Sequence, residues 1–240
     1  MPAAPRCFAL VPCAGVGARA GTGGPKQYAT LHGRAVVAHT LSALAQVTRL
    51  AATLVVLAPD DRVFEFHATR FVGPRAWVAR CGGATRAESV LGGLDALRAH
   101  DAAADDWVLV HDAARCLLQP AWVDRLIDAC LDDPVGGLLA LPLADTLKAA
   151  LPLAGGDGER VAATLDRSGK WLAQTPQMFR LGLLQSALNE AAATGVVVTD
   201  ESSAVEALGL APRLVPGDQE NLKLTWPADF ALAARLLETR

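Results

Sequence analysis

The sequence predicts an α/β fold in which a mostly parallel β-sheet carries helices on both faces. Short apolar runs alternate along the chain with stretches whose apolar residues recur at the helical period. Such alternation is typical of parallel strands joined by crossover helices. In addition, 52% of the 240 residues are hydrophobic and 20% are charged, which provides enough apolar material for a large buried core.

The regular part of this alternation ends near residue 142. We predict buried strands where short apolar runs are bounded by turn residues, at residues 7–12, 52–57, 76–80, 107–111 and 137–142. We predict helices where apolar residues recur every three to four positions, at residues 36–45, 61–70, 86–99 and 121–130. Their order is that of repeated strand–helix units.

A different pattern follows. Residues 145–174 contain no helical period, and the Gly-Gly-Asp-Gly segment at 155–158 indicates a turn between two extended pieces. A long arm inside a compact domain is usually a lid or a piece that packs on a partner. We therefore predict a single domain over residues 1–240 with a protruding arm at about residues 145–174.

The alternation resumes after the arm. We predict a helix at residues 181–193, a second helix after Thr199, and a closing helix from Pro227. Two further short strands are predicted at residues 212–215 and 222–224.

Charge and cysteine content exclude several classes of protein. A net charge of −3 argues against a general nucleic-acid-binding protein, although it allows a small polyanionic ligand. No apolar run approaches the ~18 residues of a membrane span. The five cysteines are odd in number and far apart, without a CxxC pair, so we expect neither a disulfide framework nor a zinc site. These features predict a cytoplasmic protein that acts on small molecules.

A glycine-containing loop, PCAGVGAR, follows the first predicted strand at residues 12–19. Its small residues let backbone N–H groups approach phosphate oxygens, and Arg19 and Lys26 add the positive charge that a triphosphate needs. A dinucleotide-binding fold would have glycine at Ala20 and an acid about 20 residues further on. A P-loop would have glycine where Pro25 precedes Lys26. An ordinary glycine-rich turn remains an alternative for this loop alone.

Two more strand ends carry polar residues. The segment GGATRAES at residues 82–89 joins a strand to a helix, so its glycines and Ser89 can approach a nucleotide base. The alternative is a plain turn in which Thr85 caps the helix. Asp112 follows the buried strand at 107–111 and is a candidate ligand for Mg²⁺ or substrate. We expect its neighbour His111 to be a core histidine.

Hydroxyl, lysine and arginine side chains recur in the second half of the chain. Such groups are typical of phosphate sites, and they lie in the segments 145–148, 164–167, 174–177, 199–201 and 221–225. Thr199 and Thr225 alternatively cap helices. The combination, more than any one segment, favours a phosphate site.

Together these motifs resemble those of the 2-C-methyl-D-erythritol 4-phosphate cytidylyltransferase family, which belongs to the non-mevalonate route to isoprenoid precursors. They occur in the family's order over almost the whole chain: P-x-A-G-x-G-x-R, P-K-Q-Y, G-G-x-x-R-x-x-S, H-D-A-A-R, D-T-L-K, L-D-R…W, A-Q-T-P-Q-x-F, T-D-E-x-S-A-V-E and N-x-K-x-T. Cys13, Ala84, Cys116 and Glu220 depart from the usual residues. The first three changes affect the shape of loops more than their charge.

The resemblance implies a Rossmann-like domain, a homodimer formed through the arm, and Mg²⁺-dependent transfer of CMP from CTP to a small sugar-alcohol phosphate. It implies catalytic cations at Arg19, Lys26 and Lys223. Residues implied to bind CTP are Ala14, Gly15, Gly83, Ser89 and Asp112. Residues implied to bind the acceptor are Asp112, Arg115, Thr175, Thr199 and Lys223, with Thr146 and Arg167 of the partner subunit. Asp112 is also the candidate metal ligand.

Two alternatives remain at this point. A ribitol 5-phosphate cytidylyltransferase would share the first loop and the T-P-Q and N-x-K motifs, whereas the L-D-R…W and T-D-E-x-S-A-V-E segments favour methylerythritol phosphate. A non-catalytic, nucleotide-sensing dimer is disfavoured because Arg19, Lys26 and Asp112 occur together.

Overall fold

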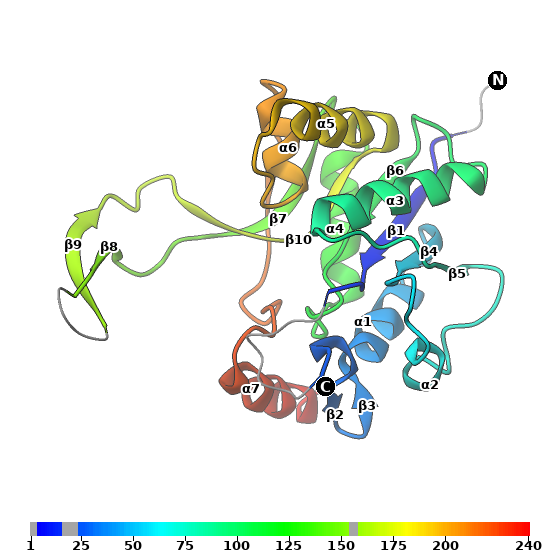
Figure 1. Ribbon diagram of the computed structural model, residues 1–240, viewed down its shortest axis with the longest axis horizontal. Helices are drawn as coiled ribbons and strands as arrows, with labels where there is room; N and C mark the ends of the chain where they lie inside the picture. The colour runs from blue at the N-terminus through cyan, green and yellow to red at the C-terminus, as the bar shows by residue number, and fades with distance from the viewer. Residues whose placement is uncertain (1–3, 16–23, 154–157) are drawn as a thin grey trace.

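The computed structural model describes residues 4–15, 24–153 and 158–240 (Figure 1). Its main sheet has seven strands in the order β11-β7-β10-β6-β1-β4-β5. Each neighbouring pair is parallel except the two that contain β10, which runs antiparallel to β6 and β7. The prediction of a mostly parallel sheet is confirmed. The strands are β1 (Cys7–Pro12), β4 (Leu50–Val56), β5 (Ala76–Ala79), β6 (Trp107–Val110), β7 (Gly136–Pro142), β10 (Trp171–Arg180) and β11 (Arg213–Pro216).

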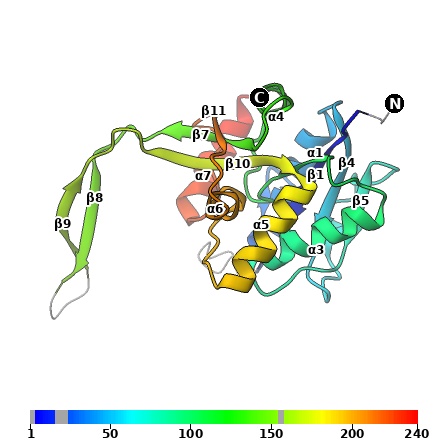
Figure 2. The ribbon, with the colours of Figure 1, turned by 90° about the horizontal axis from the view of Figure 1, so that it is seen from above.

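Helices cover both faces of this sheet, because successive side chains of a strand point to opposite sides. On β1, Phe8 and Leu10 pack in one core cluster with α3, α5 and α6, while Ala9 and Val11 pack in the other with α1 and α4. Figures 1 and 2 show the resulting layers. The helices are α1 (Val36–Ala45), α2 (Phe64–His67), α3 (Arg86–Ala99), α4 (Pro120–Cys130), α5 (Leu181–Thr194), α6 (Glu201–Ala207) and α7 (Pro227–Glu238).

The helix expected at residues 61–70 is much shorter than predicted. Only Phe64–His67 is helical, as α2. Phe64, Ala68 and Phe71 have helical spacing, but the chain leaves the helix at Ala68, whose φ and ψ are −120° and 45°. Phe71 then folds back edge-on against Phe64, with ring centroids 6.0 Å apart. Apolar contacts of a loop therefore imitate the helical period here.

The structure also differs from the sequence prediction at two strands: one predicted strand is absent, and one observed strand was not predicted. Residues 222–224 form no strand: Leu224 donates one backbone hydrogen bond to Ala114 and packs in a small core with α7. Conversely, β10 was not predicted, because its first residues belong to the expected arm and Pro176 breaks its apolar run. The register of β10 against β7 is irregular between Ala173 and Gln177, which places the Pro176 segment at that irregularity.

The arm is a two-stranded antiparallel ribbon formed by β8 (Leu147–Pro152) and β9 (Glu159–Leu165). Figure 2 shows it extending away from the body of the protein. Several apolar side chains at the arm and its junction with the body are exposed; they are Leu151, Val161, Leu165, Trp171 and Leu172.

A smaller hairpin, β2 (Thr30–Leu31) and β3 (Arg34–Ala35), follows a 3₁₀ turn, η2 (Lys26–Tyr28). A third core cluster joins this hairpin to α7 and to residues 114–117. This cluster brings two distant segments to the same edge of the main sheet: the one that begins at Lys26 and the one that ends at Leu224. All five cysteines are free thiols, and among the described residues no helix is long and apolar enough to cross a membrane.

Candidate active site

A pocket of about 460 Å³ lies at the carboxyl ends of β1 and β6, where α/β sheets bind their ligands. It brings together seven of the residues predicted to act on substrates. These are Ala14, Gly15, Lys26, Gly83, Ser89, Asp112 and Lys223. Segments that are far apart in the sequence therefore meet as the motifs predict.

The loop after β1 is tied to η2 by the side chain of Gln27, whose Nε2 donates to the backbone oxygens of Cys13 (3.0 Å) and Gly15 (2.9 Å). Next to it, Lys26 Nζ donates to the backbone oxygen of Leu224 at 2.8 Å. The η2 turn therefore contacts both the loop after β1 and the segment at residues 221–225. The predicted catalytic residue Arg19 lies outside the described residues.

The second glycine turn packs closely on the strand end beside it. Gly82 N donates to Leu57 O at 2.8 Å, and a Cβ at Gly82 would lie 2.8 Å from the same oxygen. Thr85 and Glu88 form a reciprocal capping box that begins α3. The structure thus confirms Thr85 as the helix cap, and it also directs the N-terminus of α3, which favours anions, into the pocket.

Ser89 is committed to this turn. Its hydroxyl accepts from Gly83 N at 3.1 Å and donates to Thr85 O at 2.9 Å. The side chain is buried, yet it lines the pocket. Ser89 therefore holds the backbone of Gly83 in place as well as lining the pocket.

Asp112 lies close to three cationic side chains. Its carboxylate oxygens lie 3.2 Å from Arg86 Nε, 2.9 Å from Lys223 Nζ and 3.6 Å from Arg115 Nε. Burial alone would raise the pKa of Asp112, but the three cations together hold that pKa well below its usual range. Asp112 is therefore ionised at neutral pH.

Arg86 links Asp112 to a second buried acid. Its Nη1 and Nη2 atoms bind the Glu201 carboxylate at 2.5 and 3.0 Å, a bidentate pair. Glu201 is 1% exposed, and burial raises its pKa against the opposing effect of Arg86. Sequence reasoning assigned neither residue a role. The available signal was that both stand inside matched motifs, G-G-x-x-R and T-D-E.

Behind Asp112 lies a buried hydrogen-bond chain. Asp112 N donates to Thr175 Oγ1 at 3.1 Å, and Thr175 Oγ1 lies 3.1 Å from His111 Nδ1. His111 Nε2 lies 3.2 Å from Arg115 O, which can only accept, so Nε2 carries the proton. Burial lowers the pKa of His111 to about 4. The core-histidine prediction is confirmed, and Thr175 supports Asp112 from below instead of lining the pocket.

Arg115 also belongs to this buried hydrogen-bond network behind Asp112. Its Nη1 donates to Asn221 O at 2.5 Å, and the side chain is almost fully buried. Asn221 in turn donates to Thr175 O at 2.8 Å and to Gln174 Oε1 at 3.2 Å. These bonds fix the segment that carries Lys223 against β10.

Three residues that were predicted to bind the acceptor substrate lie away from the pocket. Thr146 and Arg167 are exposed at the ends of the arm strands, and neither lines the pocket of its own chain. Thr199 is exposed just before α6. The alternative that Thr199 caps this helix is wrong, because Asp200 is the cap.

Thr225 does not cap α7 either. The residue at that cap position is Trp226. The backbone N–H groups of Thr225 and Trp226 both donate to Asp229 Oδ2 at 2.7 Å.

The pocket offers one carboxylate to a metal. Asp112 is the single acid among its described lining residues, and no group of three or more histidine, cysteine or acidic side chains gathers in the described part of the chain. A lone carboxylate that already faces three cations fits a cation shared with substrate phosphates better than an ion held by protein groups alone.

Known proteins resemble this chain over almost its whole length. The sequence profile of the IspD family, 2-C-methyl-D-erythritol 4-phosphate cytidylyltransferase, matches residues 7–239. The enzyme of that name from Laribacter hongkongensis is 57% identical over 97% of this chain and 96% of its own. A bifunctional IspD/IspF enzyme from Albidiferax ferrireducens is 59% identical over 98% of this chain, which spans about half (54%) of that protein.

Solved structures give the same relationship. A crystal structure of 4-diphosphocytidyl-2C-methyl-D-erythritol synthase matches with a TM-score of 0.82 and 42% identity, over 97% of this chain and 98% of that one. The cytidylyltransferase from Thermus thermophilus matches with a TM-score of 0.76 and 32% identity, over 97% and 99% of the two chains. The chain therefore belongs to the 2-C-methyl-D-erythritol 4-phosphate cytidylyltransferase family.

Proposed function

We propose that this protein transfers CMP from CTP to 2-C-methyl-D-erythritol 4-phosphate, which gives 4-diphosphocytidyl-2-C-methyl-D-erythritol and pyrophosphate. One observation carries the proposal beyond family membership: a single pocket is lined by both glycine turns, by Asp112 and by the cations Lys26, Arg86 and Lys223. That combination suits two phosphorylated substrates side by side.

The two glycine turns suit CTP. Small residues at Ala14, Gly15 and Gly83 allow a planar base and ribose to approach the backbone closely. Ser89 keeps the second turn in shape. The N-terminus of α3 and Lys26 supply positive potential for the triphosphate, and we assign Arg19 to the same phosphates on its motif.

Asp112 and Lys223 suit the acceptor. An ionised carboxylate accepts hydrogen bonds from the hydroxyl groups of a sugar alcohol, and an ammonium group beside it binds the phosphate. In this proposal Arg115 and Thr175 act mainly by positioning Asp112. We assign Thr199 to the acceptor on its motif alone.

The reaction needs no protein nucleophile, because the acceptor's phosphate oxygen attacks the α-phosphate of CTP and pyrophosphate leaves in line. The main obstacle is repulsion between a dianion and a triphosphate of about four negative charges. Lys26 and Lys223 lower this barrier by placing positive charge where negative charge accumulates. Arg19 has the same role.

Mg²⁺ enters this proposal bound to the phosphates of CTP. When bound, it neutralises phosphate charge and orients the leaving group. Asp112, the single acid among the described lining residues, is the residue that would help to hold it.

We also propose that two chains pair through their arms. The ribbon β8–β9 has exposed edges and exposed apolar side chains, which a second copy would cover. Pairing would bring Thr146 and Arg167 of the partner subunit to this chain's acceptor site. The five free cysteines fit a reducing compartment, so we place the dimer in the cytoplasm.

The test is pyrophosphate release with CTP and Mg²⁺, with methylerythritol 4-phosphate, with ribitol 5-phosphate, or without acceptor. Release with methylerythritol phosphate alone is the expected result. Release with ribitol phosphate alone would keep the mechanism and replace the acceptor. A folded dimer that binds CTP but turns over neither compound would be the nucleotide sensor instead.

A further inference from the structure

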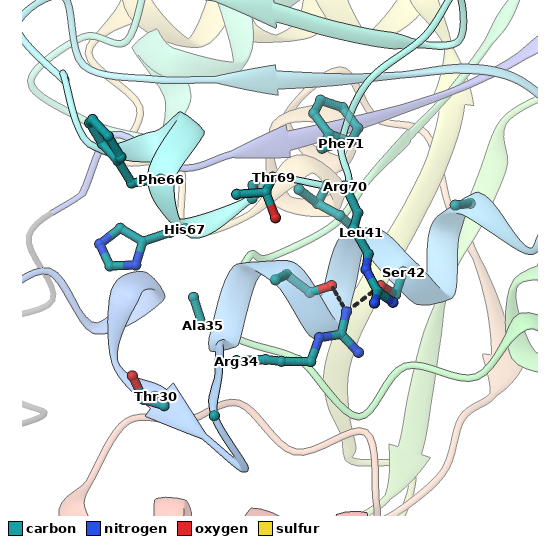
Figure 3. Close-up of a pocket in the computed structure, with 14 residues that line it drawn as sticks. Thr30, Arg34, Ala35, Leu41, Ser42, Phe66, His67, Thr69, Arg70 and Phe71 are labelled. Atoms are coloured by element: carbon teal, nitrogen blue, oxygen red, sulfur yellow. Dashed lines mark hydrogen bonds between the residues drawn. The ribbon is translucent and has the colours of Figure 1, made fainter.

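A second pocket, of about 420 Å³, lies between the β2–β3 hairpin, α1 and the loop after α2. Figure 3 shows its lining. Arg34, from the hairpin, and Arg70, from the loop after α2, both extend toward Ser42, whereas Thr69 and His67 lie on the same side of the pocket as Arg70. No lining residue is shared with the nucleotide pocket, so this is a separate cavity.

The charge in this pocket is uncompensated. As far as the structure describes the chain, its lining contains Arg34, Arg70 and His67 but no acidic residue. Among the described residues, Arg34 donates only to neutral groups, Ala38 O at 3.1 Å and Ser42 Oγ at 2.5 Å. Arg70 forms no hydrogen bond or ion pair with the described part of the protein. Arg70 is exposed, so solvent weakens the repulsion between the two guanidinium groups, and an anion bound between them would remove it.

Neutral hydrogen-bonding groups surround these cations. The hydroxyl groups of Thr30, Ser42 and Thr69 also line the pocket. Guanidinium and hydroxyl donors are the groups that proteins use to bind phosphate and carboxylate oxygens. The polar half of the pocket therefore matches an oxyanion.

The other half is apolar. Leu41, Ala38 and Ala45 form one wall on α1, and Phe66 and Phe71 flank the opposite side. Phe66 is 80% exposed, which is unusual for a large aromatic side chain without a partner. Past Phe71 the cavity continues into a second hollow of about 260 Å³ that shares Leu41, Ala45, Arg70 and Phe71. An inorganic anion would leave this surface uncovered.

The pocket also borders the element that carries Lys26. His67 stacks on Tyr28, with ring centroids 4.7 Å apart and ring planes 14° apart. Tyr28 is the last residue of η2, whose other residues, Lys26 and Gln27, line the nucleotide pocket. The two cavities thus lie on either side of one short turn.

We propose that this pocket is a second binding site, which takes a small organic anion: a phosphate or carboxylate group attached to an apolar carbon skeleton. The oxyanion binds between Arg34 and Arg70, and the carbon skeleton lies on Leu41, Phe66 and Phe71. The proposal is independent of the reaction assigned to the nucleotide pocket.

The test is calorimetric titration of the full chain with phenyl phosphate and, separately, with benzoate, each in the presence of CTP and without Mg²⁺ or acceptor. Binding of either compound supports the site and identifies the preferred oxyanion. Arg70→Ala should weaken that binding about tenfold, the size of one lost charge-assisted hydrogen bond. Arg34→Gln, which keeps a donor for Ser42, should also weaken it.

Arg98→Ala is the matched control, because Arg98 is exposed on α3 and lines neither pocket. Its binding constant should stay within about twofold of the unmodified chain. Inorganic phosphate should bind about tenfold more weakly than phenyl phosphate, because it buries no ring. Absence of binding by both probes, or binding that neither Arg70→Ala nor Arg34→Gln weakens, would overturn the proposal.

Discussion

Lys223 and Asp112 form an ion pair, with Lys223 Nζ 2.9 Å from Asp112 Oδ2. The lysine side chain is 40% exposed and the aspartate side chain 10% exposed, so the pair joins a solvated cation to a buried anion. Arg86 and Arg115 remain beside Asp112 if Lys223 turns away. The carboxylate can therefore keep its charge while Lys223 moves to a substrate phosphate.

We expect Lys26→Met to lower kcat on the order of 10²–10³-fold, because it removes one cation from the reacting phosphates. Methionine keeps the length and apolar stem of lysine but not its charge. The bond from Lys26 Nζ to Leu224 O is lost as well, so thermal melting should be recorded for each variant. Steady-state pyrophosphate release gives kcat.

Lys26→Arg is the control for charge. If charge is what matters, this variant should retain more activity than Lys26→Met, although a planar guanidinium does not replace an ammonium in detail. A kcat for folded Lys26→Met within a few-fold of the original would show that Lys26 has no catalytic role.

Glu201→Gln should act through Arg86. The buried carboxylate binds Arg86 in bidentate fashion, and removing one partner of a buried ion pair costs roughly 3 kcal/mol. The freed guanidinium can then draw closer to Asp112 and reduce its availability to the acceptor. We expect lower stability in urea and a higher KM for the acceptor, with a smaller change in the KM for CTP.

Glu190→Gln on α5 is the matched control, because Glu190 is exposed and its side chain forms no hydrogen bond within the described part of the chain. It should change neither stability nor KM. An unchanged acceptor KM in Glu201→Gln would remove the positioning role of the Arg86–Glu201 pair and leave it a structural one.

His111 should make the protein less stable in mild acid. Its pKa is about 4 in the folded chain and about 6.5 in an unfolded one. The unfolded state therefore binds more protons between these values, and stability that is present above pH 6.5 is lost as the pH falls toward 4. Between pH 7 and pH 5 the free energy of unfolding should fall by about 2 kcal/mol.

Urea unfolding at both pH values measures this loss, and His111→Gln isolates it. Other groups titrate in the same range, so the comparison is between the two losses and not between absolute stabilities. The His111→Gln chain should lose less stability than the original. Equal losses would mean that the imidazole already titrates near its usual pKa in the fold.

Much of the fold follows from local pattern. The predicted helices at 36–45 and 86–99 match α1 and α3 to the residue. Both predictions used only neighbouring residues: the spacing of apolar side chains and, for α3, the cap at Thr85. The errors occur where distant parts of the chain decide the outcome. Phe71 leaves the helical path to pack on Phe64, and β10 becomes a strand because β6 and β7 lie on either side of it.

The candidate site was likewise predicted only in part. Motifs placed the pocket residues correctly at the ends of strands, because loop position follows from strand order. The bidentate contact between Arg86 and Glu201 spans 115 positions, and no local pattern pairs two such residues. The burial of Thr175 behind Asp112 likewise depends on how β10 enters the sheet.

The proposed arm exchange predicts complementation between two inactive chains. Arg167→Ala should be inactive as a homodimer, because Arg167 serves the partner's acceptor site, and Lys26→Met should be inactive because it lacks a cation in its own pocket. In a mixed dimer, the Arg167→Ala chain keeps its own Lys26 and receives Arg167 of the partner subunit. One complete site results, so activity should return on mixing.

The measurement is pyrophosphate release after the two chains, carrying different affinity tags, are co-refolded and the mixed dimer is purified through both tags. Random mixing gives about half mixed dimers, each with one of two sites intact, so roughly a quarter of the original activity is expected in the unfractionated mixture. Arg160→Ala, which lies on β9 outside the matched motifs, is the control and should need no partner. Verified mixed dimers without activity would mean that Arg167 does not serve the other subunit.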